Sequence, residues 1–205
     1  LFGGPPREPE SELTQREMDL AASIQKVTEE IVVKIAKAIA KETGEKNLCL
    51  AGGVALNCVV NGILLREKIF ENIWIQPAAG DAGGALGAAL CVWYAHHAKE
   101  RNISANRDEM NGSYLGPEFS NEDILEYLDK CGATYHKLND TQLIEKVATA
   151  LSEEKAIGWM QGRMEFGPRS LGGRSIIADP RSLRMQKQLN LKIKYRESFR
   201  PFAPS

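Results

Sequence analysis

Two short apolar segments are each followed by a glycine-rich turn and then by a helical pattern, and this repeated order limits the fold more than any other feature. Strand, turn and helix in alternation are typical of an α/β fold, in which ligands bind at the carboxyl ends of the strands. The first strand is apolar almost throughout, so we expect it to be buried on both faces. The predicted strands are residues 47–51 and 73–76, and the helices that follow them are residues 54–68 and 82–99.

A long amphipathic helix precedes this pattern, and a second set of elements follows it. We expect the helix to run from Ser11, as its N-cap, to Thr43, with Gly44 ending it. Residues 103–117 lose all periodicity and have the composition of a linker. Beyond the linker, the pattern predicts helices over residues 121–131 and 141–153 and strands over residues 134–138 and 156–159.

The turn after the first strand is a candidate phosphate site. Gly52 and Gly53 would let backbone N–H groups approach a phosphate, and the dipole of the following helix would add positive charge there. The alternative is a plain tight turn between strand and helix. The motif is neither a dinucleotide-binding fingerprint nor a P-loop.

The turn after the second strand carries an acidic residue among glycines. Asp81 could supply a hard oxygen ligand to a metal–nucleotide complex, with the glycines clearing space around it. Asp81 could instead be only the N-cap of the helix that follows. The glycines at 83, 84 and 87 could equally reflect close helix packing.

The net charge of −1 conceals a strong division along the chain. Residues 161–200 hold ten cations and three anions, a net +7, whereas residues 1–160 hold 16 cations and 24 anions, a net −8. Most of the arginines alternate with Gly and Pro, so we expect them on rigid turns, where they suit bidentate binding of phosphate or carboxylate oxygens. The exceptions among the cations fall in a helical stretch and could equally be surface residues: Arg181, Arg184, Lys187 and Lys192. This composition predicts an anionic partner near the C-terminal end.

Other features of composition point to an intracellular protein. The cysteines are Cys49, Cys58, Cys91 and Cys131. Their spacing fits neither a disulfide framework nor a metal motif, so we expect buried, reduced thiols. The first ten residues have no signal-peptide pattern and no window is apolar enough for a membrane span, so we expect a cytoplasmic protein. Because the chain starts at Leu1 and stops at Ser205 without recognisable ends, we expect a fragment.

Four strings, taken together and in order, resemble the carbamoyltransferase family of nodulation and antibiotic-tailoring O-carbamoyltransferases. They are AGGVALNCVVNGIL, GDAGGALGAAL, WMQGRMEFGPRSLGGRSIIADPR and KYRESFRPFAP. The resemblance implies an α/β fold: residues 1–105 would be the C-terminal half of an actin-like or Hsp70-like ATPase-fold domain, similar to the threonylcarbamoyl transferases. Residues 106–205 would be the N-terminal part of a Sua5/YrdC-like domain that forms carbamoyladenylate.

The resemblance also implies a two-step reaction. Carbamoyl phosphate and ATP would give carbamoyladenylate and pyrophosphate in the second domain, and the carbamoyl group would then pass to the hydroxyl of a small-molecule acceptor in the first. By position in the matching motifs, the catalytic residues would be Arg169, Lys194 and Arg200, and the carbamoyl phosphate and adenylate ligands would also include Arg163 and Arg196. The nucleotide-binding residues of the transfer site would be Gly52, Gly53, Asn57, Gly80 and Gly83. Asp81 would ligate a divalent metal, iron or magnesium.

The chain departs from the family pattern at the metal site. His96, His97 and His136 have no ligand spacing with Asp81, so we expect surface or capping roles for them and no tightly held metal in this chain. Two alternatives to an O-carbamoyltransferase remain at this stage. One is a tRNA threonylcarbamoyladenosine-type transferase, and the other is a basic nucleic-acid-binding module, which the Gly/Pro turns disfavour.

Overall fold

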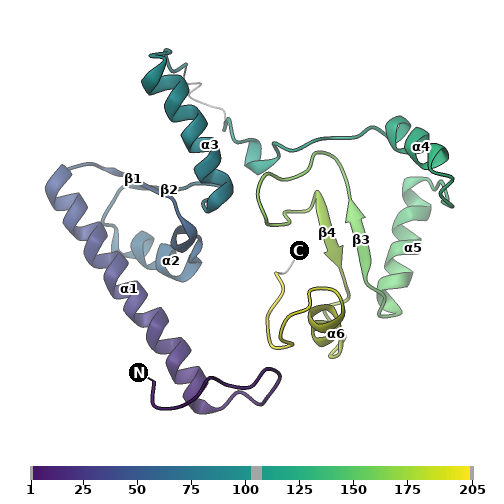
Figure 1. The fold of residues 1–205 in the computed structure, drawn as a ribbon, viewed down its shortest axis with the longest axis horizontal. Helices are drawn as coiled ribbons and strands as arrows, with labels where there is room; N and C mark the ends of the chain where they lie inside the picture. Colours follow the sequence, from purple (N-terminus) through teal and green to yellow (C-terminus); the bar gives the residue numbers. More distant parts are fainter. Residues whose placement is uncertain (1, 103–107, 204–205) are drawn as a thin grey trace. The chain divides into compact units, whose positions relative to one another are not determined.

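The computed structural model describes residues 2–102 and 108–203, which form two compact units of mixed α/β structure (Figure 1). Unit 1 contains Ser11–Ser113 with the short segments Leu1–Arg7 and Phe166–Pro168. Unit 2 contains Tyr114–Glu165 and Arg169–Ser205 with Glu8–Glu10. The mixed α/β class is confirmed. The boundary predicted between residues 105 and 106 lies outside the described residues, and the two domain assignments stay predictions.

Unit 1 begins with the long helix α1, Gln15–Thr43. Its N-cap is Thr14 and not Ser11, because Glu17 lies three residues after Thr14 and completes a capping box with it. Ser11 is followed at the same spacing by Thr14, which is not the Glu or Gln that completes a capping box. At the other end Gly44 adopts φ of 69° and closes the helix, as predicted.

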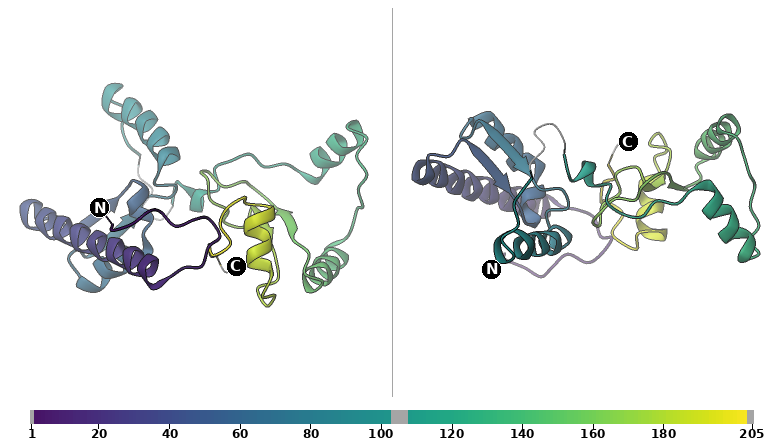
Figure 2. Two further views of the ribbon diagram at one scale, coloured as in Figure 1. Left: turned by 60° about the horizontal axis from the view of Figure 1, so that its bottom comes forward. Right: turned by 90° about the horizontal axis from the view of Figure 1, so that it is seen from above.

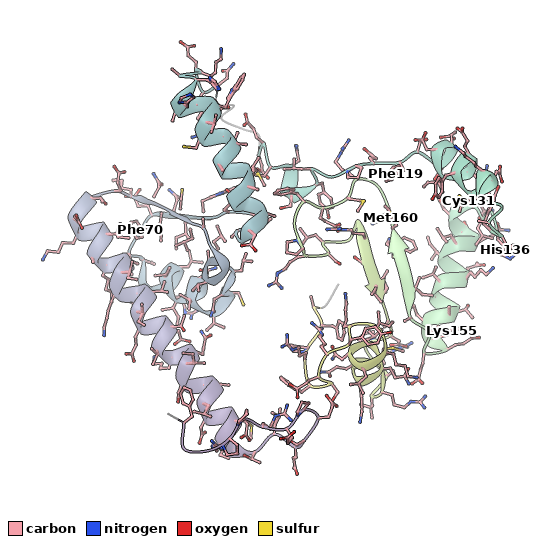
Figure 3. All side chains as sticks on the ribbon, viewed as in Figure 1. Phe70, Phe119, Cys131, His136, Lys155 and Met160 are labelled. Carbon is pink, nitrogen blue, oxygen red and sulfur yellow. The ribbon has the colours of Figure 1, made fainter. Side chains whose placement is uncertain are left out.

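Two parallel strands, β1 (Asn47–Leu50) and β2 (Asn72–Ile75), form the sheet of unit 1, with Leu50 opposite Ile75. The core packs α1 against this sheet and α2 around Ala36, Leu64 and Phe70 (Figure 3). Side chains along β1 alternate between exposed and half-buried. The expectation that this strand is buried on both faces was therefore wrong: the described residues cover only one face of the sheet.

The two helices that follow the strands are each divided. The predicted helix 54–68 is a 3-10 turn, Gly53–Leu56, followed by α2, Cys58–Glu67, because Asn57 interrupts the first and caps the second. The predicted helix 82–99 is α3, Asp81–Cys91, continued by a π-helical turn, Val92–His96. α3 has no buried residue and extends away from the sheet (Figure 2).

Unit 2 contains helices α4 (Asn121–Lys130), α5 (Asp140–Ser152) and α6 (Met185–Lys192). Its antiparallel sheet pairs β3 (Ile157–Met160) with β4 (Arg174–Ile177). A short 3-10 turn, Asn111–Ser113, ends unit 1 before this part of the chain. Ser120 and Asn139 form capping boxes at the starts of α4 and α5.

Two sequence expectations for unit 2 were wrong. Residues 134–138 form no strand, since the alternating pattern there has no neighbouring strand to pair with and its side chains are mostly exposed. The sequence did not predict β4, because the strand begins with two polar residues, Arg174 and Ser175, and only its last two residues are apolar. Arg174 therefore lies on a strand, whereas the sequence predicted a Gly/Pro turn for it.

The cysteines were also predicted wrongly. All four are exposed, because Cys49 lies on the uncovered face of β1 and the other three lie at helix ends; Figure 3 shows Cys131 after α4. His136 lies in the exposed segment of residues 132–137 that follows α4 (Figure 3), and His96 and His97 are also exposed, as expected. Within residues 2–102 and 108–203, no helix combines the length and apolar character that a membrane span requires.

Candidate functional site

In unit 1, the glycine loops that follow β1 and β2 meet at one edge of the sheet. The amide of Gly52 donates a hydrogen bond to the carbonyl of Ala79 at 2.8 Å, and the amide of Gln76 donates to Leu50 at 3.0 Å. Parallel strands place their carboxyl ends at the same edge, so this meeting follows from the predicted topology. The structure thus brings together the two loops in which the sequence predicts nucleotide-binding residues.

The glycines of these loops have different structural requirements. Gly52 has φ of 95°, which L side chains rarely adopt, whereas a Cβ at Gly53 or Gly80 would meet no atom within 4 Å. A Cβ at Gly83 would lie 2.4 Å from the carbonyl oxygen of Ala78, which accepts the Gly83 amide. Gly83 is thus explained by loop closure, and the open space lies beside Gly53 and Gly80.

Asn57 has a structural role in the described chain. Its Oδ1 accepts the backbone N–H of Val60 at 3.2 Å and caps α2, and its Nδ2 donates to Gln25 Oε1 on α1 at 2.9 Å. Both polar ends of the side chain are therefore engaged within unit 1. A nucleotide contact by Asn57 stays a prediction and would have to share or replace these bonds.

Asp81 is an exposed residue in the first turn of α3. The N-cap of that helix is Gly80, so the alternative in which Asp81 itself is the cap was wrong. Among the described residues, no three His, Cys, Asp or Glu side chains gather as a metal site would need. One exposed carboxylate is not a donor set for iron or magnesium, so the residues of this chain do not by themselves fit the implied metal.

In unit 2, a buried carboxylate organises the arginine-rich loop. Glu165 Oε1 accepts the backbone N–H groups of Leu171 and Gly173, each at 2.7 Å, and Oε2 pairs with Arg174 Nε at 3.3 Å. Burial acts to raise the pKa of Glu165, but the backbone N–H donors outweigh it and lower the pKa to about 2. Glu165 was not among the predicted site residues. The sequence feature that could have indicated its role is an acidic residue inside a cationic, glycine-rich loop.

A second carboxylate, Asp179, holds another arginine of the basic segment. Its two oxygens accept Arg181 Nε and Nη2 at 2.9 and 2.7 Å, and its Oδ1 also accepts the Arg181 backbone N–H. These bonds, chiefly those from the Arg181 side chain, lower the pKa of Asp179 to about 2. Arg181 is thus neutralised by a fixed partner.

The ten cations of residues 161–200 divide into two equal groups. Five arginines are engaged: Arg163 with Gly116 and Glu118, Arg174 with Glu165, Arg181 with Asp179, Arg184 with Glu154, and Arg196 with Asn190. The other five side chains form no hydrogen bond or ion pair within the described part of the chain. They are Arg169, Lys187, Lys192, Lys194 and Arg200. All three predicted catalytic residues therefore belong to the unpaired group.

A cavity of about 730 Å³ lies in unit 2. Among the described residues that line it, Lys194 is the only cation. Ser170, Leu171 and Gly172 from the arginine-rich loop line it, as do Phe202 and Ala203 from the C-terminal segment. Arg169 directly precedes the first of these stretches, and Arg200 lies two residues before the second. The structure thus brings both predicted motifs to one cavity.

Arg163 and Arg196 differ from these three. The guanidinium of Arg163 donates to the carbonyl of Gly116 at 2.7 Å and pairs with Glu118. That of Arg196 donates to Asn190 Oδ1 at 2.6 Å and lies over the Phe202 ring, 4.9 Å from its centroid. Arg163 and Arg196, which were predicted as further ligands of carbamoyl phosphate, thus have structural partners of their own.

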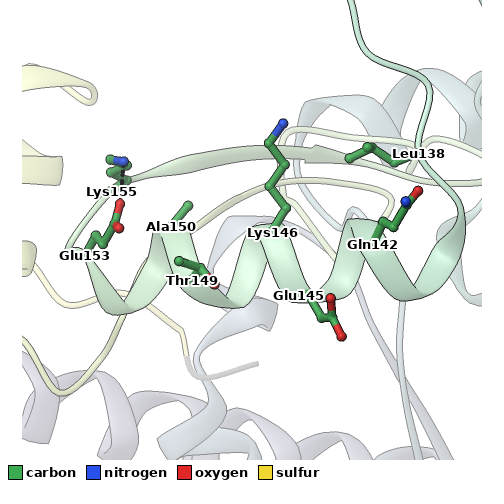
Figure 4. A pocket seen from close by; sticks show the side chains of 8 residues that line it. All are labelled: Leu138, Gln142, Glu145, Lys146, Thr149, Ala150, Glu153 and Lys155. Atoms are coloured by element: carbon green, nitrogen blue, oxygen red, sulfur yellow. Dashed lines mark hydrogen bonds and ion pairs between the residues drawn. The ribbon is translucent and has the colours of Figure 1, made fainter.

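A shallower hollow of about 510 Å³ runs along α5 (Figure 4). Its charged lining residues are Glu145, Lys146, Glu153 and Lys155, of which the last two form an ion pair. It contains none of the predicted site residues and presents an ordinary mixed helix surface. We assign it no role.

The fold and these two loop systems define an α/β protein with two adjoining glycine-rich loops in one unit and an arginine-rich loop that contributes to a cavity in the other. Comparison with known proteins identifies the family. The description "Carbamoyltransferase N-terminus" matches residues 2–90 and "Carbamoyltransferase C-terminus" matches residues 148–205. The chain belongs to the carbamoyltransferase family.

Three relatives illustrate the similarity. An uncharacterized protein of Synechocystis sp. is 62% identical over 207 residues, which covers 100% of this chain and 34% of the relative. Nodulation protein NolO of Bradyrhizobium diazoefficiens is 45% identical, over 94% of this chain and 34% of its own length. Nodulation protein U of Rhizobium fredii is 36% identical, over 78% of this chain and 25% of its own length. The chain thus spans about a third or less of the curated relatives it matches.

Proposed function

We propose that this chain is part of an ATP-dependent O-carbamoyltransferase, and that the cavity of unit 2 binds carbamoyl phosphate and the carbamoyladenylate made from it. The observation that carries the proposal is that Lys194 lines this cavity, while Arg169 and Arg200 stand within two residues in sequence of residues that line it, and that none of the three side chains is paired in the described chain. The other seven cations of residues 161–200 are either engaged with partners in the chain, as five arginines are, or, like Lys187 and Lys192, do not line the cavity. Unpaired cations at a cavity are the groups that a phosphate ligand requires.

The chemistry of the first step sets what these residues would do. To form carbamoyladenylate, the phosphate of carbamoyl phosphate leaves as inorganic phosphate with uptake of one water, and a carbamate oxygen displaces pyrophosphate from the α-phosphorus of ATP. Every reactant and product is anionic, so catalysis by positioning and charge neutralisation needs fixed cations and no side-chain nucleophile. Arg169 and Arg200 would bind the phosphate oxygens, and Lys194 would act as a mobile point charge.

The second step would take place at the glycine loops of the actin-like domain, of which unit 1 would be the C-terminal half. Gly52 and Gly53 would face the nucleotide, and the open space beside Gly53 and Gly80 supports this role. The acceptor would be a small molecule that carries a hydroxyl group. Because Asp81 alone does not make a metal site, any metal ligands besides Asp81 would come from outside the described residues.

Binding to the chain and exchange in a full-length relative test this proposal. Carbamoyl phosphate should bind the 205-residue chain, and Arg169→Ala, Lys194→Ala and Arg200→Ala should each weaken binding by about tenfold or more, the loss of one charged hydrogen bond. In full-length NolO, alanine at the three matching positions should abolish the carbamoyl phosphate-dependent exchange of pyrophosphate into ATP.

Lys187→Ala provides the matched control, because Lys187 is also an unpaired cation of the basic segment but does not line the cavity. It should leave binding unchanged. Equal loss in Lys187→Ala and Lys194→Ala would show that general positive charge, and not the cavity, binds the ligand. Exchange that persists in all three NolO variants would remove these residues from the reaction.

Half of the basic segment's cations are engaged within the chain, which reduces the charge available to nucleic acid. A phosphate-backbone binder presents its Lys and Arg on an exposed face, and its affinity falls steeply with salt. Generic RNA should therefore bind weakly to this chain.

A further inference from the structure

Asn190, on α6, is a fully buried polar residue of unit 2, with an exposed fraction of 0%. A buried amide side chain needs partners for its donor and its acceptor, because an unsatisfied polar group in the interior is costly. In the described chain every partner of this side chain belongs to the segment of residues 194–200.

The three contacts of the Asn190 side chain come from different points of that segment. Its Nδ2 donates to the carbonyl of Ser198 at 3.1 Å and to that of Arg200 at 2.7 Å. Its Oδ1 accepts Arg196 Nε at 2.6 Å, and its own backbone carbonyl accepts the Arg196 amide at 3.0 Å. One side chain therefore fixes both the middle and the end of the segment.

Gln186 lies one turn before Asn190 on the same face of α6 and forms a second set of hydrogen bonds to the segment. Its Nε2 donates to the carbonyls of Phe199 and Arg200, each at 3.1 Å. Residues four apart on a helix lie one above the other, so the two amides form a short row along which the chain is held. The carbonyl of Arg200 receives a bond from each.

A residue with a positive φ stands near the start of this segment. Tyr195 adopts φ of 47°, which is uncommon for a residue with a side chain and has to be held by its surroundings. Lys194 immediately before it lines the cavity, and Phe202 beyond the row lines the cavity again. The bonds to α6, together with those between Glu10 and residues 197 and 198, thus hold the chain between these two points of the cavity wall.

We infer that Asn190, assisted by Gln186, is a positioning residue that holds Lys194 and Arg200 in the arrangement in which they bind the carbamoyl donor. Asn190 does not line the cavity and does not touch the ligand; it acts through the backbone of residues 194–200. This inference rests on the proposed function of the unit 2 cavity.

The test replaces Asn190 in the 205-residue chain with Leu, which has a similar size and no hydrogen-bonding group. Asn190→Leu should weaken carbamoyl phosphate binding by about tenfold or more, as expected when the ordering of two ligand-binding cations is lost. Gln186→Leu should weaken it by a smaller factor, since Asn190 still holds the Arg200 carbonyl; because Gln186 also lines the cavity, Asn190→Leu is the variant that tests positioning. Amide hydrogen exchange of residues 194–200 should become faster in both variants, and more so in Asn190→Leu.

Two control variants separate positioning from a general loss of stability. Gln188→Leu changes an amide on the same helix whose side chain makes no hydrogen bond within the described chain, and it should leave binding and exchange unchanged. Leu151→Ala should destabilise unit 2 from α5 without weakening binding at temperatures where the chain is folded. Binding that falls equally in Leu151→Ala and Asn190→Leu would overturn the inference.

The outcomes also distinguish the inference from the function on which it rests. If the unaltered chain does not bind carbamoyl phosphate, the proposed function fails and the inference with it. If the chain binds and Arg200→Ala weakens binding while Asn190→Leu does not, the proposed function stands and only the positioning role is overturned.

Discussion

The carboxylate of Glu165 accepts the amide of Gly173 at 2.7 Å, across a loop that begins and ends at these two residues. The same carboxylate binds Leu171 and Arg174, so removing it leaves the buried Gly173 amide and two partly buried donors without this partner. Glu165→Ala should lower the free energy of unfolding of unit 2 by about 3 kcal/mol, and Glu165→Gln by less, because the amide keeps one acceptor oxygen. Urea unfolding followed by tryptophan fluorescence measures this difference.

Glu118 offers a matched control for this prediction. It is also paired with an arginine, Arg163, but both side chains are about half exposed. Exposed ion pairs contribute little, so Glu118→Gln should change the free energy of unfolding by less than about 0.5 kcal/mol. Similar losses in Glu118→Gln and Glu165→Ala would contradict the organising role of Glu165.

Acid should destabilise unit 2 through the same carboxylates. Glu165 and Asp179 both have a pKa lowered to about 2, from ordinary values of 4.5 and 3.8. A group whose pKa is lower in the folded state stabilises the fold above its unfolded pKa and loses that contribution as the pH falls towards its folded pKa. Unfolding free energies should therefore be level above about pH 5 and fall between about pH 4.5 and 2. A double variant, Glu165→Gln with Asp179→Asn, should show a shallower fall; an unchanged slope would exclude these groups as its source.

The sequence predicted the local order of the fold well where a signal is contained within a few residues. The two strands of unit 1 and the closure of α1 at Gly44 are each confirmed to within one residue. Thr14 and Asn57 show the limit of such signals: several polar residues could cap a helix, and the choice depends on reciprocal partners such as Glu17 or Gln25. Burial was predicted poorly, because it depends on which neighbouring elements cover a face.

The site shows the same division. The sequence identified the motifs that contain Arg169, Lys194 and Arg200, but periodicity and charge carry no information about which cations are neutralised by distant carboxylates. Glu165 and Asn190 were missed for a related reason. Each binds mainly backbone groups of a loop, and no residue-type pattern records a bond to the backbone.

Gly52 and Gly53 should differ in how much stability the same substitution costs. Gly52 has φ of 95°, where a Cβ is strained, so Gly52→Ala should lower the free energy of unfolding by about 1–2 kcal/mol. Gly53 has open space and no positive φ, so Gly53→Ala should be neutral for stability. If the Gly53 backbone faces a nucleotide, the added methyl group should still weaken ATP binding. Thermal unfolding and ATP titration of both variants check this pair, and equal destabilisation would contradict it.

Asn57 allows its cap to be separated from a nucleotide contact. Asn57→Ala removes the acceptor for the Val60 amide and should cost about 1 kcal/mol, whereas Asn57→Asp keeps that acceptor and should cost less. A carboxylate would repel the phosphates of ATP, so unchanged ATP affinity in Asn57→Asp would assign the residue to the cap alone. Weaker binding in Asn57→Asp, with stability retained, would instead support the nucleotide contact.

The two apolar faces of α1 should differ sharply in their tolerance of charge. Ala36 is 3% exposed and packs with Leu64 and Phe70, whereas Ile31 is 51% exposed on a row of apolar residues that no described element covers. That row is Leu20, Ile24, Val27, Ile31 and Ile35.

Ile31→Glu should change the free energy of unfolding by less than about 0.5 kcal/mol, because the residue is exposed and Glu favours a helix at least as well as Ile. Ala36→Glu should cost about 3 kcal/mol or more, since it places a charge in the core of unit 1. Circular dichroism during urea unfolding measures both values, and a large loss in Ile31→Glu would mean that this row is packed in solution.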